Sequence, residues 1–179
     1  MRVFKFGGAS VKDAEGVINV VKVLNEMGHE DTLVVVSAMG KSTNAFEGVV
    51  DAYFEDPDSC KAALHDLEMF HQEIVKTLFN GAHGPVAKRV KNLCAQCDTF
   101  LANNRSPHRA FVYDQVVSFG ELLSTSIICA YLNHVGIAAE WVDARSCIKT
   151  DNFYRSAHLN WEQTCLLYTS PSPRDLWIS

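Results

Sequence analysis

The chain has 179 residues, of which 47% are hydrophobic and 21% are charged, and its formal net charge at pH 7 is −5. This balance provides enough apolar material for one folded domain and is unlike the composition of a disordered chain. Because the 16 lysines and arginines form no basic stripe, nucleic acid is a poor candidate partner, and we expect small-molecule ligands.

The chain starts without a targeting pattern. No apolar run reaches the length of a membrane span, and Met1 leads straight into a strand pattern rather than a signal peptide. We therefore expect a cytoplasmic protein with no membrane partner. The six cysteines have irregular spacing, which predicts reduced thiols and no structural disulfides.

The first elements predict a parallel crossover. Residues 3–6 form a short apolar strand, which a glycine pair ends. A helix then runs from Asp13, a candidate N-cap, to a stop at Gly28. The β-branched run 32–36 is typical of a strand buried on both faces. Strand, glycine turn, helix and strand together predict a right-handed parallel unit.

Three helical patterns follow. The predicted helices are Thr43 to Glu55, Ser59 to Asn80 with Asp58 as its cap, and Val86 to Leu101.

Residues 111–142 are predicted to contain a buried helix and a further strand of the sheet. Residues 111–117 fit a strand or a helix equally well. A buried helix is expected from Glu121 to Val135, and a further strand from Ile137 to Val142 with Asp143 at its end. The predicted fold class is therefore α/β, with helices covering a mostly parallel sheet.

The last stretch differs from everything before it. Residues 165–179, CLLYTSPSPRDLWIS, contain two Ser-Pro steps and leucines without a period. The string CLLYTSPSPRD resembles the translation of a sequencing adapter read through in frame. We expect residues 165–179 to be a non-native tail, and residues 1–164 to be the N-terminal part of a catalytic domain. A natural Ser/Pro-rich tail is the alternative.

The turn after the first strand fits phosphate binding. Gly7 and Gly8 allow close approach of backbone N–H groups to an anion, and Lys5 supplies a positive charge. An ordinary turn with a surface lysine is the alternative. A charge in an otherwise apolar strand is costly unless it is paired, which favours a ligand role for Lys5.

Two further turns rich in glycine and serine are candidate parts of a ligand site. Gly40-Lys41-Ser42 resembles the end of a Walker A loop, but Val35 stands where that motif needs its first glycine. Glu121 begins an apolar helix after Ser118-Phe119-Gly120. An acidic residue there can simply complement the helix dipole, and that alternative stays open.

The cysteines and histidines give no metal site. Cys94 and Cys97 fall in a helical pattern with no second CxxC motif, so burial in a helix face is expected. His65 and His71 lie on different faces of one helix. Asp143 fits a turn aspartate better than a ligand.

Three segments taken together resemble the signatures of the aspartokinase family. They are KFGGASV at residues 5–11, VSAMGKSTN at residues 36–44 and SFGE at residues 118–121. The family's first signature is KFGGTSV, so only Ala9 departs from it, which removes a hydroxyl near the phosphates. The resemblance extends to about Thr164, and residues 149–151 also look like the family.

The resemblance implies the amino-acid kinase fold, a three-layer α/β/α sandwich, and ATP-dependent phosphorylation of the L-aspartate side chain. It implies that Lys5 is catalytic and binds the phosphates together with Gly7, Gly8 and Ser10. Magnesium would accompany the nucleotide. It implies likewise that the residues contacting aspartate are Ser37, Thr43 and Glu121.

The resemblance also implies that the chain is incomplete. The family's arginine-glycine-glycine-serine-aspartate segment has no counterpart here, and neither have the nucleotide-binding half and the regulatory domains. We expect the 179-residue chain to be inactive alone, and the full-length protein to be a homo-oligomer. The alternatives are a kinase for glutamate, acetylglutamate or carbamate, and a non-catalytic binding domain with the same fold.

Overall fold

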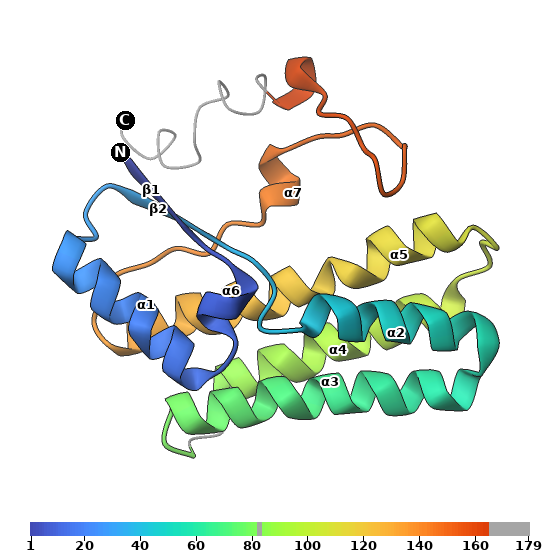
Figure 1. Cartoon of the computed structure of the whole chain (residues 1–179), viewed down its shortest axis with the longest axis horizontal. Coiled ribbons are helices and arrows are strands. Elements are labelled where there is room, and N and C mark those ends of the chain that lie inside the picture. The colour runs from blue at the N-terminus through green and yellow to red at the C-terminus, as the bar shows by residue number, and fades with distance from the viewer. Residues whose placement is uncertain (82–83, 165–179) are drawn as a thin grey trace, which may run out of the picture. The chain divides into compact units, whose positions relative to one another are not determined.

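The computed structural model describes residues 1–81 and 84–164 (Figure 1). The predicted non-native tail, 165–179, lies outside the described residues. The described elements, in chain order, are β1 Arg2–Phe6, the 3-10 helix η1 Gly8–Val11, α1 Ala14–Met27, β2 Thr32–Val36, α2 Ser42–Glu55, α3 Pro57–Leu78, α4 Pro85–Asn103, α5 Arg109–Val117, α6 Phe119–His134 and α7 Ala144–Cys147.

The chain divides into two compact units. The first, Met1–Trp141, holds both described strands and all helices up to α6. The second begins at Val142 and contains α7 and an antiparallel bridge between Thr150 and Leu159. All the residues with a predicted site role lie in the first unit.

The predicted parallel pairing of the first two strands is confirmed. Strands β1 and β2 pair in parallel, with Lys5 opposite Val35 and Phe6 opposite Val36. Because side chains alternate along a strand, one face of the sheet carries phenylalanines and Val36, which pack on the core.

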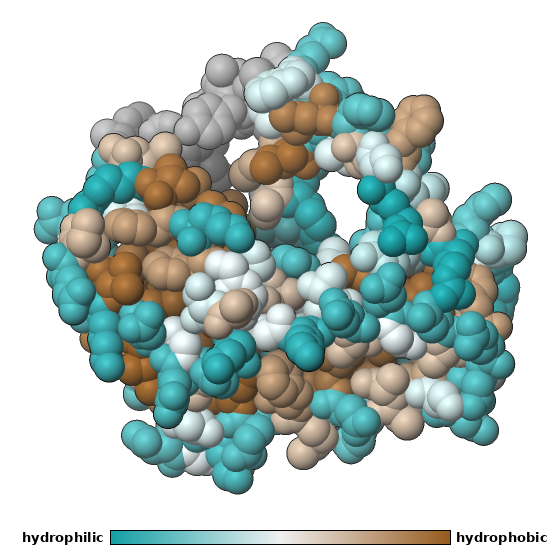
Figure 2. Space-filling model, viewed as in Figure 1, coloured by the Kyte–Doolittle hydropathy of each residue, from teal (hydrophilic) through white to brown (hydrophobic). Residues whose placement is uncertain are grey.

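The expectation that the second strand is buried on both faces is wrong. Leu33 is 48% exposed, Val35 44% and Val3 of the neighbouring strand 59%. Among the described residues, core helices pack against one face of this sheet only. Figure 2 shows apolar side chains gathered over the region of the two strands.

Helix α1 begins and ends where the sequence predicts. The Asp13 carboxylate caps it by accepting a hydrogen bond of 2.9 Å from the Gly16 N–H. Its buried stripe consists of Ala14, Val17, Val20 and Leu24. Gly28, with φ of 79°, ends it.

The N-terminal cap of α3 lies two residues before the predicted one. The Asp56 side chain, not that of Asp58, caps the helix and accepts from the Asp58 N–H at 3.2 Å. Pro57 occupies the first helical turn, where a missing N–H costs nothing. An aspartate on each side of the proline made the two positions hard to separate from sequence.

The ambiguous segment at residues 111–117 is helical. It lies within α5, where Val112 and Val116 are buried four residues apart on one face. Helices α2, α3 and α4 run beside one another, and α5 packs on α2 (Figure 1).

Helix α6 is the central helix of the first unit. It contacts α2, α3, α4, α5 and β2, and its buried residues point in several directions. The stretch Arg109–His134 is long and apolar enough to cross a membrane by length and composition alone, contrary to the sequence expectation. In the structure it comprises α5 and α6, and the buried core helix of a globular protein meets the same criterion.

The strand predicted from Ile137 to Val142 is wrong. The Asn133 side chain hydrogen-bonds both backbone groups of Ala139: it donates to the carbonyl at 2.8 Å and accepts from the N–H at 3.2 Å. The Ile137 N–H bonds to Leu132. These groups are therefore satisfied by the end of α6 and not by a strand ladder.

The second unit is organised by two aspartates. Asp143 caps α7 by accepting from the Arg145 N–H at 3.0 Å, which agrees with the turn interpretation. Asp151 accepts from the His158 N–H at 3.0 Å and the Phe153 N–H at 3.1 Å. These backbone hydrogen bonds hold the pKa of the Asp151 carboxyl below its ordinary value.

Candidate functional site

The first turn of the site follows β1. Gly7 precedes η1, and the Ser10 N–H donates to the Gly7 carbonyl at 2.9 Å. A Cβ placed on Gly7 would lie 3.3 Å from the Lys5 Nζ, so the ammonium lies over this glycine. The structure therefore brings Lys5 and the glycine pair together as the sequence predicts.

The second turn follows β2 and leads into α2. The Ser37 N–H donates to the Phe6 carbonyl at 3.0 Å, which continues the parallel pairing beyond the strand. Gly40 has φ of 55°, a conformation that favours glycine. Its N–H donates to the Gly8 carbonyl at 3.0 Å, so the first and second turns are joined directly.

The third turn begins α6. Gly120 packs on the second turn, because a Cβ placed there would lie 3.0 Å from the Ala38 Cβ. One turn later in the helix, the Ser124 hydroxyl donates to the Ser37 carbonyl at 2.8 Å. The start of α6 is thus fixed against the residues that follow β2.

The three turns meet around Ala38. A Cβ placed on Gly8 would lie only 2.7 Å from the Ala38 oxygen, and one placed on Gly120 would lie 3.0 Å from the Ala38 Cβ. Segments separated by more than a hundred residues in the chain are therefore neighbours in the fold. This is the arrangement expected where the carboxyl ends of parallel strands form a ligand crevice.

A charged side chain stands at each of the three turns: Lys5 at the first, Lys41 at the second and Glu121 at the third. Lys5 is exposed, and the described residues offer it no ion pair. The premise that its strand buries it is therefore wrong: it lies on the open face of the sheet. Glu121 is half-buried in the first turn of α6. An unpaired ammonium beside a glycine turn fits an anionic group such as a phosphate.

The remaining predicted residues lie on the same turns. Ser37 and Thr43 are half-buried, on either side of Ala38 and Gly40, and Ser10 is exposed within η1. The described part of the chain shows no cluster of three metal-ligating side chains.

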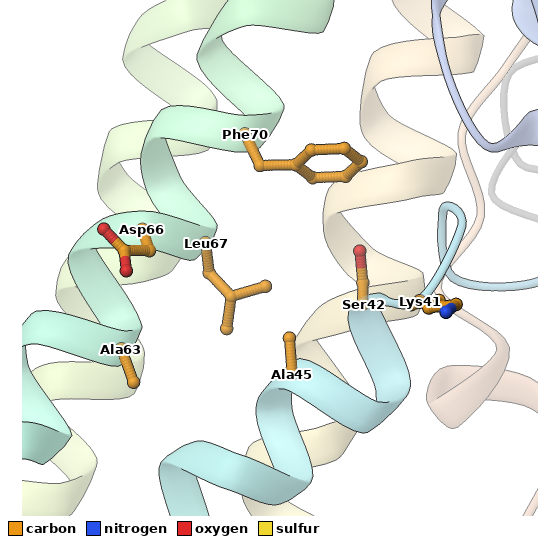
Figure 3. A pocket seen from close by; sticks show the side chains of 7 residues that line it. All are labelled: Lys41, Ser42, Ala45, Ala63, Asp66, Leu67 and Phe70. Carbon is orange, nitrogen blue, oxygen red and sulfur yellow. The ribbon is translucent and has the colours of Figure 1, made fainter.

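A separate groove of about 350 Å³ opens between α2 and α3 (Figure 3). It is lined by Lys41, Ser42, Ala45, Ala63, Asp66, Leu67 and Phe70. Its walls are mostly apolar, and in Figure 3 the Asp66 carboxylate points away from Lys41. None of the predicted ligand residues lines it, so we do not place the substrate site there.

The cysteine interpretation is confirmed. Cys94 and Cys97 are both buried in α4, and burial raises the pKa of each thiol to about 12. Such thiols are inert at neutral pH.

Sequence reasoning missed two polar residues that lie beside the second turn. Ser124 is fully buried on α6 and bonds Ser37. His71 is fully buried on α3, and its Nε2 lies 3.4 Å from the Ser42 hydroxyl. The available signal was their position: His71 continues the stripe of Leu64, Leu67 and Ile74, where a polar residue has to find a partner.

Comparison with known proteins gives a consistent result. The profile described as "Amino acid kinase family" matches residues 1–167. The chain is 32% identical over 161 residues to aspartokinase 3, chloroplastic, of Arabidopsis thaliana, and 25% identical over 150 residues to the bifunctional aspartokinase/homoserine dehydrogenase 2 of Escherichia coli. The first alignment covers 84% of this chain and 27% of that protein, the second 84% and 18%.

Solved structures show the same fold. Escherichia coli aspartokinase III in complex with lysine and aspartate matches with a TM-score of 0.82, and its complex with aspartate and ADP with 0.81. Each is 22% identical, and the match covers 93% of this chain and 36% of that one. The predicted amino-acid kinase fold is therefore confirmed. The chain spans about a quarter of the Arabidopsis relative's length, and in the described residues helices cover one face of the two-stranded sheet.

Proposed function

This chain belongs to the amino acid kinase family, and we propose that it carries the N-terminal part of an aspartate kinase catalytic domain. The reaction is ATP-dependent phosphorylation of the L-aspartate side-chain carboxylate to 4-phospho-L-aspartate. That step leads to lysine, threonine, methionine and isoleucine.

The convergence of the three turns around Ala38 carries this proposal. Gly8 and Gly120 contact the same alanine, and the Gly40 N–H bonds Gly8. The arrangement places a cationic turn next to a turn that starts with a carboxylate. A substrate with a phosphate at one end and an α-ammonium group at the other matches both charges.

The phosphate side of the site consists of Lys5, Gly7, Gly8 and Ser10. The Lys5 ammonium neutralises charge that develops on the transferred phosphoryl group, and the backbone of the glycine turn donates to phosphate oxygens. When bound with the nucleotide, magnesium shares the phosphate charge. Catalysis of this kind works by positioning and needs no covalent nucleophile.

The acceptor side consists of Ser37, Thr43 and Glu121. The two hydroxyls contact the aspartate, and the Glu121 carboxylate binds its α-ammonium group. The Ser124 hydroxyl donates to the Ser37 carbonyl, and this bond fixes the start of α6, with Glu121, relative to Ser37. A carboxylate fixed in this way distinguishes an amino acid from a dicarboxylate that lacks the amine.

The nucleotide side of the site is expected from outside residues 1–164. In one complex of Escherichia coli aspartokinase III, aspartate and ADP are bound by a chain of which this one covers 36%. We propose that the full-length protein is a cytoplasmic homo-oligomer. For the 179-residue chain by itself, calorimetry with aspartate or with magnesium ATP is expected to show weak or no binding.

The experiment is an acceptor panel with residues 1–164 continued by the rest of their own coding sequence. The protein is incubated with magnesium ATP and L-aspartate, L-glutamate or N-acetyl-L-glutamate, and the acyl phosphate is trapped with hydroxylamine. We expect kcat/KM for aspartate to exceed the others by about 10-fold or more. Lys5→Met is expected to lower kcat by about 100-fold without unfolding the protein, because Lys5 is exposed.

Phosphorylation of glutamate or acetylglutamate but not aspartate would replace the proposal with another amino-acid kinase. No phosphorylation of any acceptor would favour a binding domain that has kept the fold.

A further inference from the structure

The segment that follows α6 turns back along this helix and reaches a tryptophan. Near the end of α6, the Asn133 side chain holds Ala139 with two hydrogen bonds. Two residues later, the Trp141 indole N–H donates to the Thr125 hydroxyl at 2.9 Å, nearer the start of the helix. The segment therefore runs antiparallel to α6, toward the first turn of the helix, where Glu121 lies.

The Thr125 hydroxyl is hydrogen-bonded on both sides. It accepts from Trp141, and its own hydrogen donates to the Glu121 carbonyl at 2.6 Å, whereas the Leu122 carbonyl is farther away at 3.5 Å. A hydroxyl has one hydrogen and two lone pairs, so the two bonds do not compete. Indole, hydroxyl and carbonyl thus form a chain in which each donor has its own acceptor. Thr125 and Glu121 are four residues apart and share one face of the helix.

The Trp141 ring is held in place by a neighbouring helix. The Arg89 guanidinium of α4 lies over the ring, 5.1 Å from its centroid, and the half-buried ring packs against the core. Ser124, the residue before Thr125, bonds the second turn. Two separate contacts therefore hold the start of α6, one on the second turn and one on Trp141.

We propose that Trp141 is a positioning residue for the acceptor side of the site, which acts through Thr125 on the backbone at Glu121. A threonine in a helix divides between two χ1 rotamers, and the indole N–H favours the one whose hydroxyl bonds the Glu121 carbonyl. A hydroxyl bonded to the carbonyl one turn earlier bends a helix, so this bond sets the direction in which the Glu121 carboxylate leaves α6. The consequence for L-aspartate binding rests on the proposed function, whereas the effect on α6 does not.

The first test is amide hydrogen exchange on the 179-residue chain without substrate, so a failure of the kinase proposal leaves it unaffected. The reporter is the Thr125 amide, whose helical acceptor is the Glu121 carbonyl, and the reference is the buried Cys97 in α4. Trp141→Phe keeps a ring beside Arg89 and removes the N–H. Thr125→Val keeps the branched shape and removes the hydroxyl, and Thr125→Ser keeps the hydroxyl.

We expect Trp141→Phe and Thr125→Val each to speed exchange at Thr125 about 5-fold relative to Cys97, as expected for one lost hydrogen bond. Thr125→Ser should restore most of the protection. In the Thr125→Val background, Trp141→Phe should add little, because the indole bond is already absent. Equal acceleration at Thr125 and Cys97 would overturn the proposal, since it would reduce Trp141 to core packing, and unchanged exchange at Thr125 would overturn it as well.

The second test is steady-state kinetics of the same variants in the longer protein. Trp141→Phe and Thr125→Val should raise the KM for L-aspartate about 3-fold to 10-fold with little change in kcat, and Thr125→Ser should do so least. Trp161→Phe is the control, because Trp161 is 70% exposed. Faster exchange at Thr125 with an unchanged KM would overturn the proposal. If the unchanged longer protein phosphorylates no acceptor, the kinase proposal fails, and the exchange result alone decides whether Trp141 fixes the start of α6.

Discussion

Replacement of Gly8 by alanine tests the contact on which the arrangement of the site depends. A Cβ at this position would lie 2.7 Å from the Ala38 oxygen and 3.0 Å from the Gly40 oxygen. Both are backbone atoms, so no side-chain rotation can relieve the clash, and the first and second turns must move apart. Overpacking of this kind costs about 1–3 kcal/mol.

A matched glycine in the same unit gives the opposite expectation. Gly48 lies within α2, and a Cβ there would have no heavy atom within 4 Å. Gly48→Ala should therefore stabilise the protein by about 0.5–1 kcal/mol, since alanine loses less conformational entropy in a helix.

The assay is urea unfolding of the two variants and the unchanged chain, followed by circular dichroism at constant pH. The midpoint should fall for Gly8→Ala and rise for Gly48→Ala, with similar slopes. A Gly8→Ala midpoint equal to or above that of the unchanged chain would refute the close approach of the two turns.

Two further predictions concern buried groups. Burial lowers the pKa of His71 below 6.5, so the unfolded chain binds a proton that the folded one resists, and stability should fall as the pH drops below about 6.5. His71 contributes at most about 1.4 kcal/mol to this loss between about pH 7.5 and about pH 5.5. Urea unfolding at a series of pH values should therefore show that the stability of His71→Asn depends on pH by up to that much less. If His71→Asn keeps the full pH dependence, the assignment is wrong. At pH 8, maleimide labelling followed by peptide mass spectrometry should modify the exposed Cys147 and spare Cys94 and Cys97. The pKa of about 12 of the two buried thiols leaves roughly a thousandfold less thiolate than in an ordinary thiol. Labelling of all three cysteines at similar rates in the folded chain would contradict the burial of Cys94 and Cys97.

The parts of the fold that the sequence predicted are those set by local chemistry. Asp13 and Gly28 bound the first helix, because capping and a positive φ are properties of single residues. The glycine pair at residues 7–8 could be located for the same reason. The resemblance then predicted that turns far apart in sequence belong to one site.

The errors have a different physical origin. Residues 137–142 have the composition of a strand, but a strand exists only where a neighbour supplies its hydrogen bonds, and here the Asn133 side chain supplies them. The exposure of Leu33 and Val35 likewise depends on what covers the sheet. The sequence pattern of a segment does not show which group will bond its backbone or which element will cover its face.

His71 illustrates a third case. Its place on an apolar stripe agrees with its burial, which was not predicted, and Ser42, whose hydroxyl lies 3.4 Å from its Nε2, is 29 residues earlier on another helix. Contacts of this kind are visible only once the helices are packed.

The most direct test of the account compares two glutamates that both lie in the first turn of a helix. Glu121 starts α6 at the site, and Glu15 starts α1 and is exposed. If Glu121 only complements a helix dipole, then Glu121→Gln and Glu15→Gln should behave alike.

In the longer protein, the account predicts that Glu121→Gln raises the KM for L-aspartate by about 10-fold to 100-fold with little change in kcat, because a charge-assisted bond to the α-ammonium group is lost. Glu15→Gln should leave both constants unchanged. A Glu121→Gln enzyme whose KM for aspartate matches that of the Glu15→Gln enzyme would contradict the proposed acceptor site.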